Sequence, residues 1–288
     1  MKVYISNYLS KSISVLNYET FNLEEDIELE ERIYPHHFCI DKEKSLIYIP
    51  SSNDGVLYVL DLITNKIIDN ISIGGSLSQV ALCNGELFVS NEDSNSIYII
   101  EQDSLNPIGI ISVDEMPHGF DFDHEDNRLY VPCINSIVCI DTTNKCIDKK
   151  VDTEFKAWHI KIDKEKNEIY TSTLDGKLVI LDGTDMKVKK IIEEFLLPVQ
   201  ICFNYSKNRV YIADLGYKSI RILEYETGKY LESIEVNGNP QGLEISKNEE
   251  LLFVSDTQRN SIKIYSTLDN SLLKEVKVGK EPTTILCL

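Results

Sequence analysis

The sequence has few of the residues and patterns that mark several large classes of protein. Its 288 residues include one tryptophan and five histidines, and no two cysteines have the CxxC spacing. No apolar run reaches the length of a membrane span, because each is strand-sized and is interrupted by Asp, Asn or Lys. The opening stretch "MKVYISNYLS" alternates like a strand and lacks the apolar region of a secretory signal. We therefore expect a cytoplasmic location and no membrane partner.

Positive charge is also scarce. The chain has 29 Lys and Arg against 47 Asp and Glu, which gives a net charge of −18 and a pI of about 4.7. A field of this sign repels phosphate backbones, which excludes nucleic acid as an expected partner. The acids are scattered rather than clustered, as is typical of a well-solvated surface. We expect a monomer.

The cysteines do not form a disulfide framework. Their number is odd, and several lie inside apolar strand runs such as "HFCI" and "VALC". Reduced cysteines that serve as small buried hydrophobic residues fit a reducing compartment. The seven positions are Cys39, Cys83, Cys133, Cys139, Cys146, Cys202 and Cys287.

An aromatic residue recurs within a short β-branched run along the whole chain. The spacing between successive aromatic anchors is 40 to 44 residues. Such a constant period indicates a repeat architecture. The seven anchors are Tyr4, Tyr48, Phe88, Tyr130, Tyr170, Tyr211 and Phe253.

Each repeat contains four short strand patterns separated by Asn, Asp, Gly and Lys turns, with little helical periodicity. Four-stranded units of this length predict an all-β, seven-bladed β-propeller. The segment "EPTTILCL" at the end reads as an opening strand whose anchor is Tyr4. We therefore predict one domain over residues 1–288, closed by a composite first blade from 1–31 and 282–288.

The stretches "YISNYLSKSISVLNYET" and "FVSNEDSNSIYIIEQDS" carry a resemblance to a known family. They resemble the YVTN-type seven-bladed propeller repeats, and this resemblance extends over essentially the whole chain. Streptogramin lyases and lactonase-type propellers are more distantly similar. The resemblance implies the fold and leaves the function open, because the repeat mostly encodes strands and turns.

Polar residues that follow the opening proline of each repeat, or its substitute, are expected around one mouth of the central channel, where propeller loops converge. Four of the five histidines and the only tryptophan share this position. The candidate ligand-binding residues here are His36, His37, Gln79, His118, Trp158, His159, Gln200 and Gln241.

A second set lies three residues beyond each anchor and is expected at the same mouth. It supplies amides, a thiol and two carboxylates as further candidates. These residues are Asn7, Asn91, Cys133, Asp214 and Asp256, with Ser51 and Thr173 at the equivalent places in the other two repeats.

The favoured function is binding of a small molecule or a protein at this histidine-rich mouth. Imidazole ligands would suit a transition metal such as Zn or Fe, and the candidate ligands are His37, His118 and His159. Strand alternation leaves open which of His36 and His37 faces the channel. A metal-assisted lyase or hydrolase acting at the same mouth is the alternative.

The two enzyme families each differ from this chain. Streptogramin lyases use a histidine after the proline and a glutamate just past an anchor strand, and the closest candidate, Glu92, lies one residue too far along. Lactonase-type propellers favour basic residues at the mouth, where none of the five arginines is expected. These departures argue against both chemistries, although the choice between enzyme and binding protein stays open.

Overall fold

The computed structural model describes residues 2–288 and confirms the predicted fold class, an all-β seven-bladed β-propeller. All regular structure in these residues is β-strand, so they contain no helix long and apolar enough to cross a bilayer. The strands form seven four-stranded sheets, here called blades 1 to 7 in chain order. By compactness the chain divides into two units: unit 1 comprises residues 1–29, 172–180 and 189–288, and unit 2 comprises 30–171 and 181–188.

Unit 2 contains blades 2, 3 and 4, and in each the strands follow one another from the inner to the outer edge. Their strands are β4 (Cys39–Asp41), β5 (Leu46–Ser51), β6 (Val56–Asp61) and β7 (Lys66–Ser72) in blade 2; β8 (Leu77–Cys83), β9 (Glu86–Asn91), β10 (Ser96–Glu101) and β11 (Pro107–Ser112) in blade 3; and β12 (Asp121–Asp123), β13 (Arg128–Cys133), β14 (Ser136–Asp141) and β15 (Cys146–Asp152) in blade 4.

Blade 5 has strands in both units, and unit 1 contains blades 6 and 7. The strands are β16 (Ala157–Asp163), β17 (Glu168–Thr173), β18 (Leu178–Asp182) and β19 (Val188–Ile192) in blade 5; β20 (Pro198–Asn204), β21 (Arg209–Asp214), β22 (Ser219–Glu224) and β23 (Tyr230–Glu235) in blade 6; and β24 (Pro240–Ile245), β25 (Leu251–Asp256), β26 (Ser261–Ser266) and β27 (Leu272–Lys277) in blade 7.

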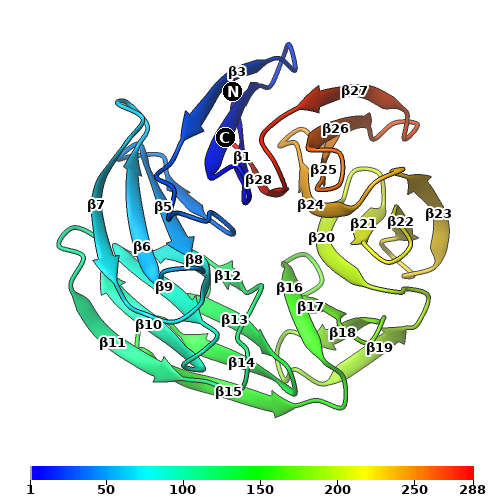
Figure 1. Cartoon of the computed structure of the whole chain (residues 1–288). Helices are drawn as coiled ribbons and strands as arrows, with labels where there is room; N and C mark the ends of the chain where they lie inside the picture. Colours follow the sequence, from blue (N-terminus) through cyan, green and yellow to red (C-terminus); the bar gives the residue numbers. More distant parts are fainter. Residues whose placement is uncertain (1) are drawn as a thin grey trace. The chain divides into compact units, whose positions relative to one another are not determined.

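Blade 1 is composite, as the repeat period predicts. Its order is β28-β1-β2-β3, built from β1 (Lys2–Asn7), β2 (Ser12–Asn17), β3 (Leu23–Glu28) and β28 (Pro282–Cys287). Val3 pairs with Cys287 in antiparallel register, and Ile5 pairs with Ile285. Figure 1 shows the red C-terminal strand beside the blue β1.

The polar turns between strands are stabilised by Asp and Asn side chains. Asp61 accepts backbone hydrogen bonds from Ile63 and Thr64 at the end of β6, and Asp141 makes the equivalent pair after β14. Asn127 and Asn167 adopt positive φ of 53° and 51° ahead of their anchor strands, a conformation that asparagine tolerates better than most residues. The turn residues therefore fix where each strand begins and ends.

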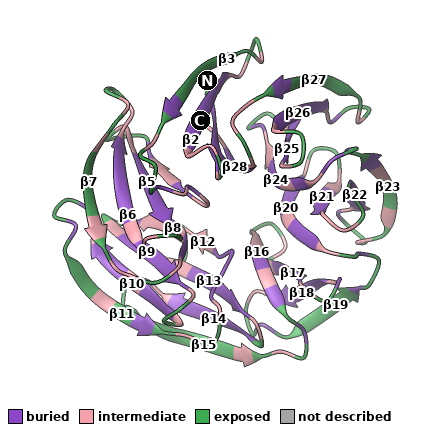
Figure 2. Ribbon diagram, viewed as in Figure 1, coloured by how far each residue is buried: buried purple, intermediate pink, exposed green. Residues whose placement is uncertain are grey.

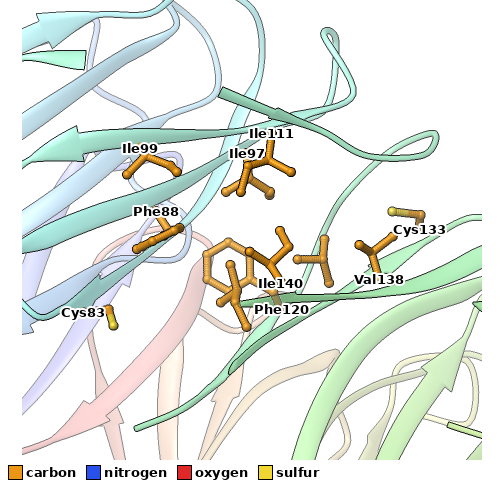
Figure 3. Packing of buried hydrophobic residues seen from close by; sticks show 11 residues of the cluster. Cys83, Phe88, Ile97, Ile99, Ile111, Phe120, Cys133, Val138 and Ile140 are labelled. Carbon is orange, nitrogen blue, oxygen red and sulfur yellow. The ribbon is translucent and has the colours of Figure 1, made fainter. Parts of the chain in front are cut away.

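Apolar side chains of the inner strands pack between neighbouring blades within each unit. In unit 2, Phe88 and Ile97 of blade 3 pack against Phe120 and Ile140 of blade 4 (Figure 3). In unit 1, Phe253 belongs to a cluster shared by blades 1 and 7. Outer strands such as β3, β15 and β27 are mostly exposed (Figure 2), so each blade is held mainly through its inner three strands.

Candidate metal centre

His36 and His37 lie in a connecting segment rather than in a strand. Pro35 forms a single β-bridge with Ser51, and regular pairing in blade 2 starts only at Cys39. The sequence leaves open whether the strand has already begun at His36 and His37, in which case the two side chains would point to opposite faces. Because the segment is irregular, the two imidazoles are not forced to opposite faces, and their ring centroids lie 4.2 Å apart.

His118 lies in the equivalent segment of blade 4, where its backbone N–H donates to the carbonyl of Pro132 at 3.2 Å. His159, by contrast, lies within β16 of blade 5. A Cβ on Gly119 would lie only 2.2 Å from Nδ1 of His159. Glycine at position 119 therefore makes room for the imidazole of His159.

These four histidines form one group, here called the histidine cluster. Its ring centroids are 5.8 Å apart between His37 and His118, 5.2 Å between His37 and His159, and 5.1 Å between His118 and His159. In this trio, one possible ligand nitrogen from each ring lies within 4.8 Å of those from the other two. His36 adds a fourth ring, 5.8 Å from that of His118. The three residues predicted to bind metal are thus brought together.

Two further side chains hold His118. Its Nδ1 lies 2.5 Å from Oε1 of Glu92, an arrangement in which the ring N–H donates to a carboxylate. The indole of Trp158 stacks on the imidazole ring of His118, with a centroid distance of 3.9 Å and an interplanar angle of 17°. The imidazole is therefore fixed by both a hydrogen bond and a stacked neighbour.

Burial lowers the pKa values of three imidazoles in the cluster. The pKa of His36 is lowered to about 3, first by desolvation and then by the nearby His118. Desolvation also lowers the pKa values of His37 and His159 well below 6.5, with neighbouring imidazoles adding to the effect. The exposed fractions of His118 and His159 are only 7% and 9%. Neutral imidazoles have the free lone pair that metal ligation requires.

The other predicted residues of the proline-following set are the glutamines Gln79, Gln200 and Gln241. In unit 2, Gln79 donates from Nε2 to the carbonyl of Phe120 at 2.7 Å and so braces blade 3 against blade 4. In unit 1, Gln200 and Gln241 are half-buried on β20 and β24. Only the histidines and Trp158 among this set contact one another through their rings.

The residues three positions beyond the anchors are buried, and most bond to backbone. Asn91 donates to the carbonyl of Gly74 at 2.8 Å, and Asn7 donates to the hydroxyls of Ser12 and Ser14. Asp214 accepts from the backbone N–H groups of Leu196 and Leu197, each at 3.0 Å. Asp256 accepts from the backbone of Asn239 at 3.0 Å. These contacts organise the connecting segments.

Cys133 lies in the apolar cluster between blades 3 and 4 (Figure 3). Its side chain is fully buried, and burial raises the pKa of the thiol to about 12. A thiol with so high a pKa is neither a nucleophile nor a ready ligand near neutral pH.

Glu92 is the residue that sequence reasoning set aside. Strand β9 ends at Asn91, and the backbone N–H of Glu92 donates to the carbonyl of Ser76. The chain therefore turns after Asn91, and the side chain one residue beyond the expected position reaches His118. The sequence signal for this contact is a carboxylate that directly follows one anchor strand, together with a histidine at the start of the next repeat.

Comparisons with known proteins agree on the fold. No family model and no curated protein matches the chain. A protein from Lactobacillus plantarum is 12% identical, with a TM-score of 0.85 and full coverage of both chains. Hydrazine synthase of Kuenenia stuttgartiensis is 15% identical, with a TM-score of 0.78 over 88% of this chain and 90% of that one. The dihydro-heme d1 dehydrogenase NirN is 10% identical, with a TM-score of 0.76 over 99% and 74%. At such low identities these similarities place the chain among β-propeller proteins and specify nothing further.

Proposed function

We propose that the protein is a binding propeller whose histidine cluster holds one divalent transition-metal ion through His37, His118 and His159. The observation that carries this proposal is the convergence of three imidazole nitrogens within 4.8 Å. Three histidines are a common protein ligand set for zinc.

The geometry fits an ion after a modest contraction. Zinc–nitrogen bonds of about 2.0–2.1 Å in a tetrahedral arrangement bring ligand nitrogens to about 3.3 Å from one another. The three nitrogens therefore need to draw together by on the order of 1 Å, which small side-chain rotations supply. His37 belongs to a connecting segment rather than a strand, so it can adjust, while His118 is held by Glu92 and Trp158 and His159 lies within β16.

Glu92 supports the same interpretation. Metal-binding histidines commonly donate their second ring N–H to a carboxylate, which orients the ring and raises its basicity. With Nδ1 of His118 on Glu92, Nε2 is the nitrogen left for the ion. Glu92 is thus a positioning residue that acts through His118.

The donor set indicates which ions fit. Nitrogen ligands without a carboxylate among the three favour Zn, Cu, Ni or Fe over Mg and Ca, which prefer oxygen. A bound ion of this class supplies Lewis acidity and lowers the pKa of a coordinated water. The acidic surface of the protein raises the local concentration of cations and so favours loading.

A metal-assisted lyase or hydrolase at the same site is the second candidate. The pairing of Glu92 with His118 favours it, because a histidine after the proline and a glutamate past an anchor strand are the residues that streptogramin lyases use. Membership of the YVTN-type family and a cytoplasmic monomer belong to the same proposal, and Gln200 and Gln241 stay ligand-binding candidates within unit 1.

Elemental analysis of tag-free protein tests the metal. We expect close to one Zn, Cu, Ni or Fe per chain, and loss of that metal in the triple variant H37Q/H118Q/H159Q. H124Q is the matched control, because His124 lies outside the cluster and contacts Phe122 edge-on. Protein stripped with a chelator should bind the metal again when the metal is added back. When Co²⁺ is added instead, the protein should show the visible absorption of a nitrogen-ligated Co²⁺ ion. Absence of metal and of Co²⁺ absorption in the wild type would contradict the proposal.

A further inference from the structure

Arg221 in unit 1 differs from every other arginine of the chain. The remaining four each have a carboxylate oxygen within 4 Å, whereas no carboxylate among residues 2–288 lies that close to Arg221. The partners are Glu30 for Arg32, Asp141 for Arg128, Glu232 for Arg209 and Asp256 for Arg259. In a chain with 47 acidic residues, an arginine without an acidic partner is notable.

The guanidinium of Arg221 lies among aromatic rings instead. Its Cζ is 4.5 Å from the ring centroid of Tyr230, 5.0 Å from that of Tyr217 and 5.9 Å from that of Phe195. Its Nε is buried without a hydrogen-bond partner, and neither Nη donates a hydrogen bond within residues 2–288. The rings hold the cation by cation–π attraction and leave its donors unused.

The equivalent cation in the next blade shows what a self-contained arrangement looks like. Lys263 is the third residue of β26, as Arg221 is of β22. Nζ of Lys263 lies 2.8 Å from Oδ2 of Asp256 and also donates to the carbonyl of Val236. In blade 6 the carboxylate of Asp214 at the corresponding strand end is occupied by the backbone of Leu196, Leu197 and Tyr217, so Arg221 has no internal anion.

Two exposed side chains belong to the surroundings of this cation: Tyr217 lies against the guanidinium, and Leu196 follows Phe195 in the chain. Leu196 is 55% exposed and Tyr217 is 50% exposed. A Cβ on Gly216 would lie 2.6 Å from Cγ of Leu196, so the leucine covers the backbone immediately before Tyr217. An unpaired guanidinium fork beside an aromatic ring and an aliphatic side chain is suited to a carboxylate that carries an apolar group.

We propose that Arg221, with Tyr217 and Leu196, forms a binding site for a small organic carboxylate. The two Nη groups would donate to the carboxylate, while the aromatic ring and the leucine contact its apolar part. The long-range repulsion of anions by this acidic protein is screened beyond about 8 Å at physiological salt. Contact with the guanidinium therefore decides binding.

Arginine-selective NMR tests this site directly. With ¹⁵Nε-labelled arginine the protein gives five Nε–H signals, which single Arg→Lys variants assign. The buried Nε of Arg221 exchanges slowly with water and is therefore observable. Phenylacetate, titrated at constant ionic strength, should shift the Arg221 signal saturably and leave those of Arg32 and Arg259 in place. The neutral isostere phenylacetamide should cause no such shift.

Binding of phenylacetate to the arginine variants is measured by the broadening of the NMR lines of phenylacetate. R221K keeps the charge but loses the fork, and we expect its dissociation constant to rise at least tenfold, whereas R259K should bind as the wild type does. An equal shift of all five arginine signals, a shift with phenylacetamide as large as with phenylacetate, or unchanged binding in R221K would each overturn the proposal.

Discussion

The segments Pro117-His118-Gly119 in blade 4 and Pro240-Gln241-Gly242 in blade 7 occupy the same place in their blades, yet they have different neighbours. A Cβ on Gly119 would meet the imidazole of His159 at 2.2 Å. A Cβ on Gly242 would meet the backbone carbonyl of Thr283 at 1.9 Å. Both glycines permit close approach of the adjoining inner strand. In unit 2 that closeness gathers imidazoles, whereas in unit 1 it gathers backbone.

Hydroxyl groups in unit 1 also bond to the protein itself. In unit 1, Ser255 accepts from the backbone of Gly242 and donates to the carbonyl of Thr283, and the hydroxyls of Ser6 and Thr283 lie 2.8 Å apart. These polar groups satisfy one another within the protein. The histidine cluster of unit 2 instead concentrates four imidazoles, side chains that transition metals take as ligands. One repeat frame thus serves structure in one unit and a candidate site in the other.

Replacement of the metal-binding histidines should remove the difference in metal binding between the two units. H37Q, H118Q and H159Q, made singly, should each weaken Zn²⁺ or Co²⁺ binding by at least about 100-fold, because a three-histidine site loses a third of its ligands. Competition with a chromophoric chelator measures the affinity. H124Q should retain wild-type affinity, and an equal loss in H124Q would show that the metal is bound elsewhere.

The two glycines allow a crossed test. G242A should cost more stability than G119A, since a backbone carbonyl yields less readily than an imidazole, with each change costing about 1–3 kcal/mol. G119A alone should abolish metal binding, because it displaces His159. Urea unfolding of metal-free protein gives the first quantity, and Co²⁺ absorption gives the second. Metal binding retained by G119A would contradict the packing described for His159.

Glu92 should have a smaller effect than the ligands. E92Q keeps the size of the side chain but weakens the hydrogen bond to His118, and we expect metal affinity to fall about 10- to 100-fold. E92D should recover part of the loss if the carboxylate is what matters. D93N, which changes an exposed neighbouring acid, serves as the control and should bind metal normally.

Mild acid should reveal the cluster in metal-free protein. His36, His37 and His159 have pKa values lowered from about 6.5, so below that pH the unfolded chain binds protons that the folded chain does not. Their contribution to stability is complete above pH 6.5 and is lost as the pH falls below it. The wild type should lose about 4 kcal/mol more than H37Q/H118Q/H159Q between pH 7 and pH 5, about 2 kcal/mol for each of His37 and His159. Parallel urea midpoints for the two proteins would argue that the histidines are solvated.

The fold was predictable because the repeat recurs seven times. Anchors such as Tyr48 and Phe253 are fully buried in second strands, as their spacing indicates. A period of about forty residues with polar turns averages out local ambiguity, so the composite first blade also followed from the spacing.

The details of the site depend on irregular backbone, which spacing does not encode. Strand β4 begins only at Cys39, so alternation could not decide between His36 and His37. Glu92 reaches His118 because the chain turns after Asn91, and a register count along the strand missed it. Cys133 aligns with polar residues in other blades, but its burial follows from packing between β13 and the neighbouring blade.

The pairing of β28 with β1 also has a consequence for biosynthesis. Ile5 and Ile285 are register partners about 280 positions apart, and synthesis proceeds at roughly 5–20 residues per second. The inner edge of β1 therefore waits on the order of 15–60 seconds for its partner while the other blades emerge. During that interval the backbone donors and acceptors of this edge can pair with other strands. The nascent chain is therefore most vulnerable to mispairing at β1, until β28 pairs with it.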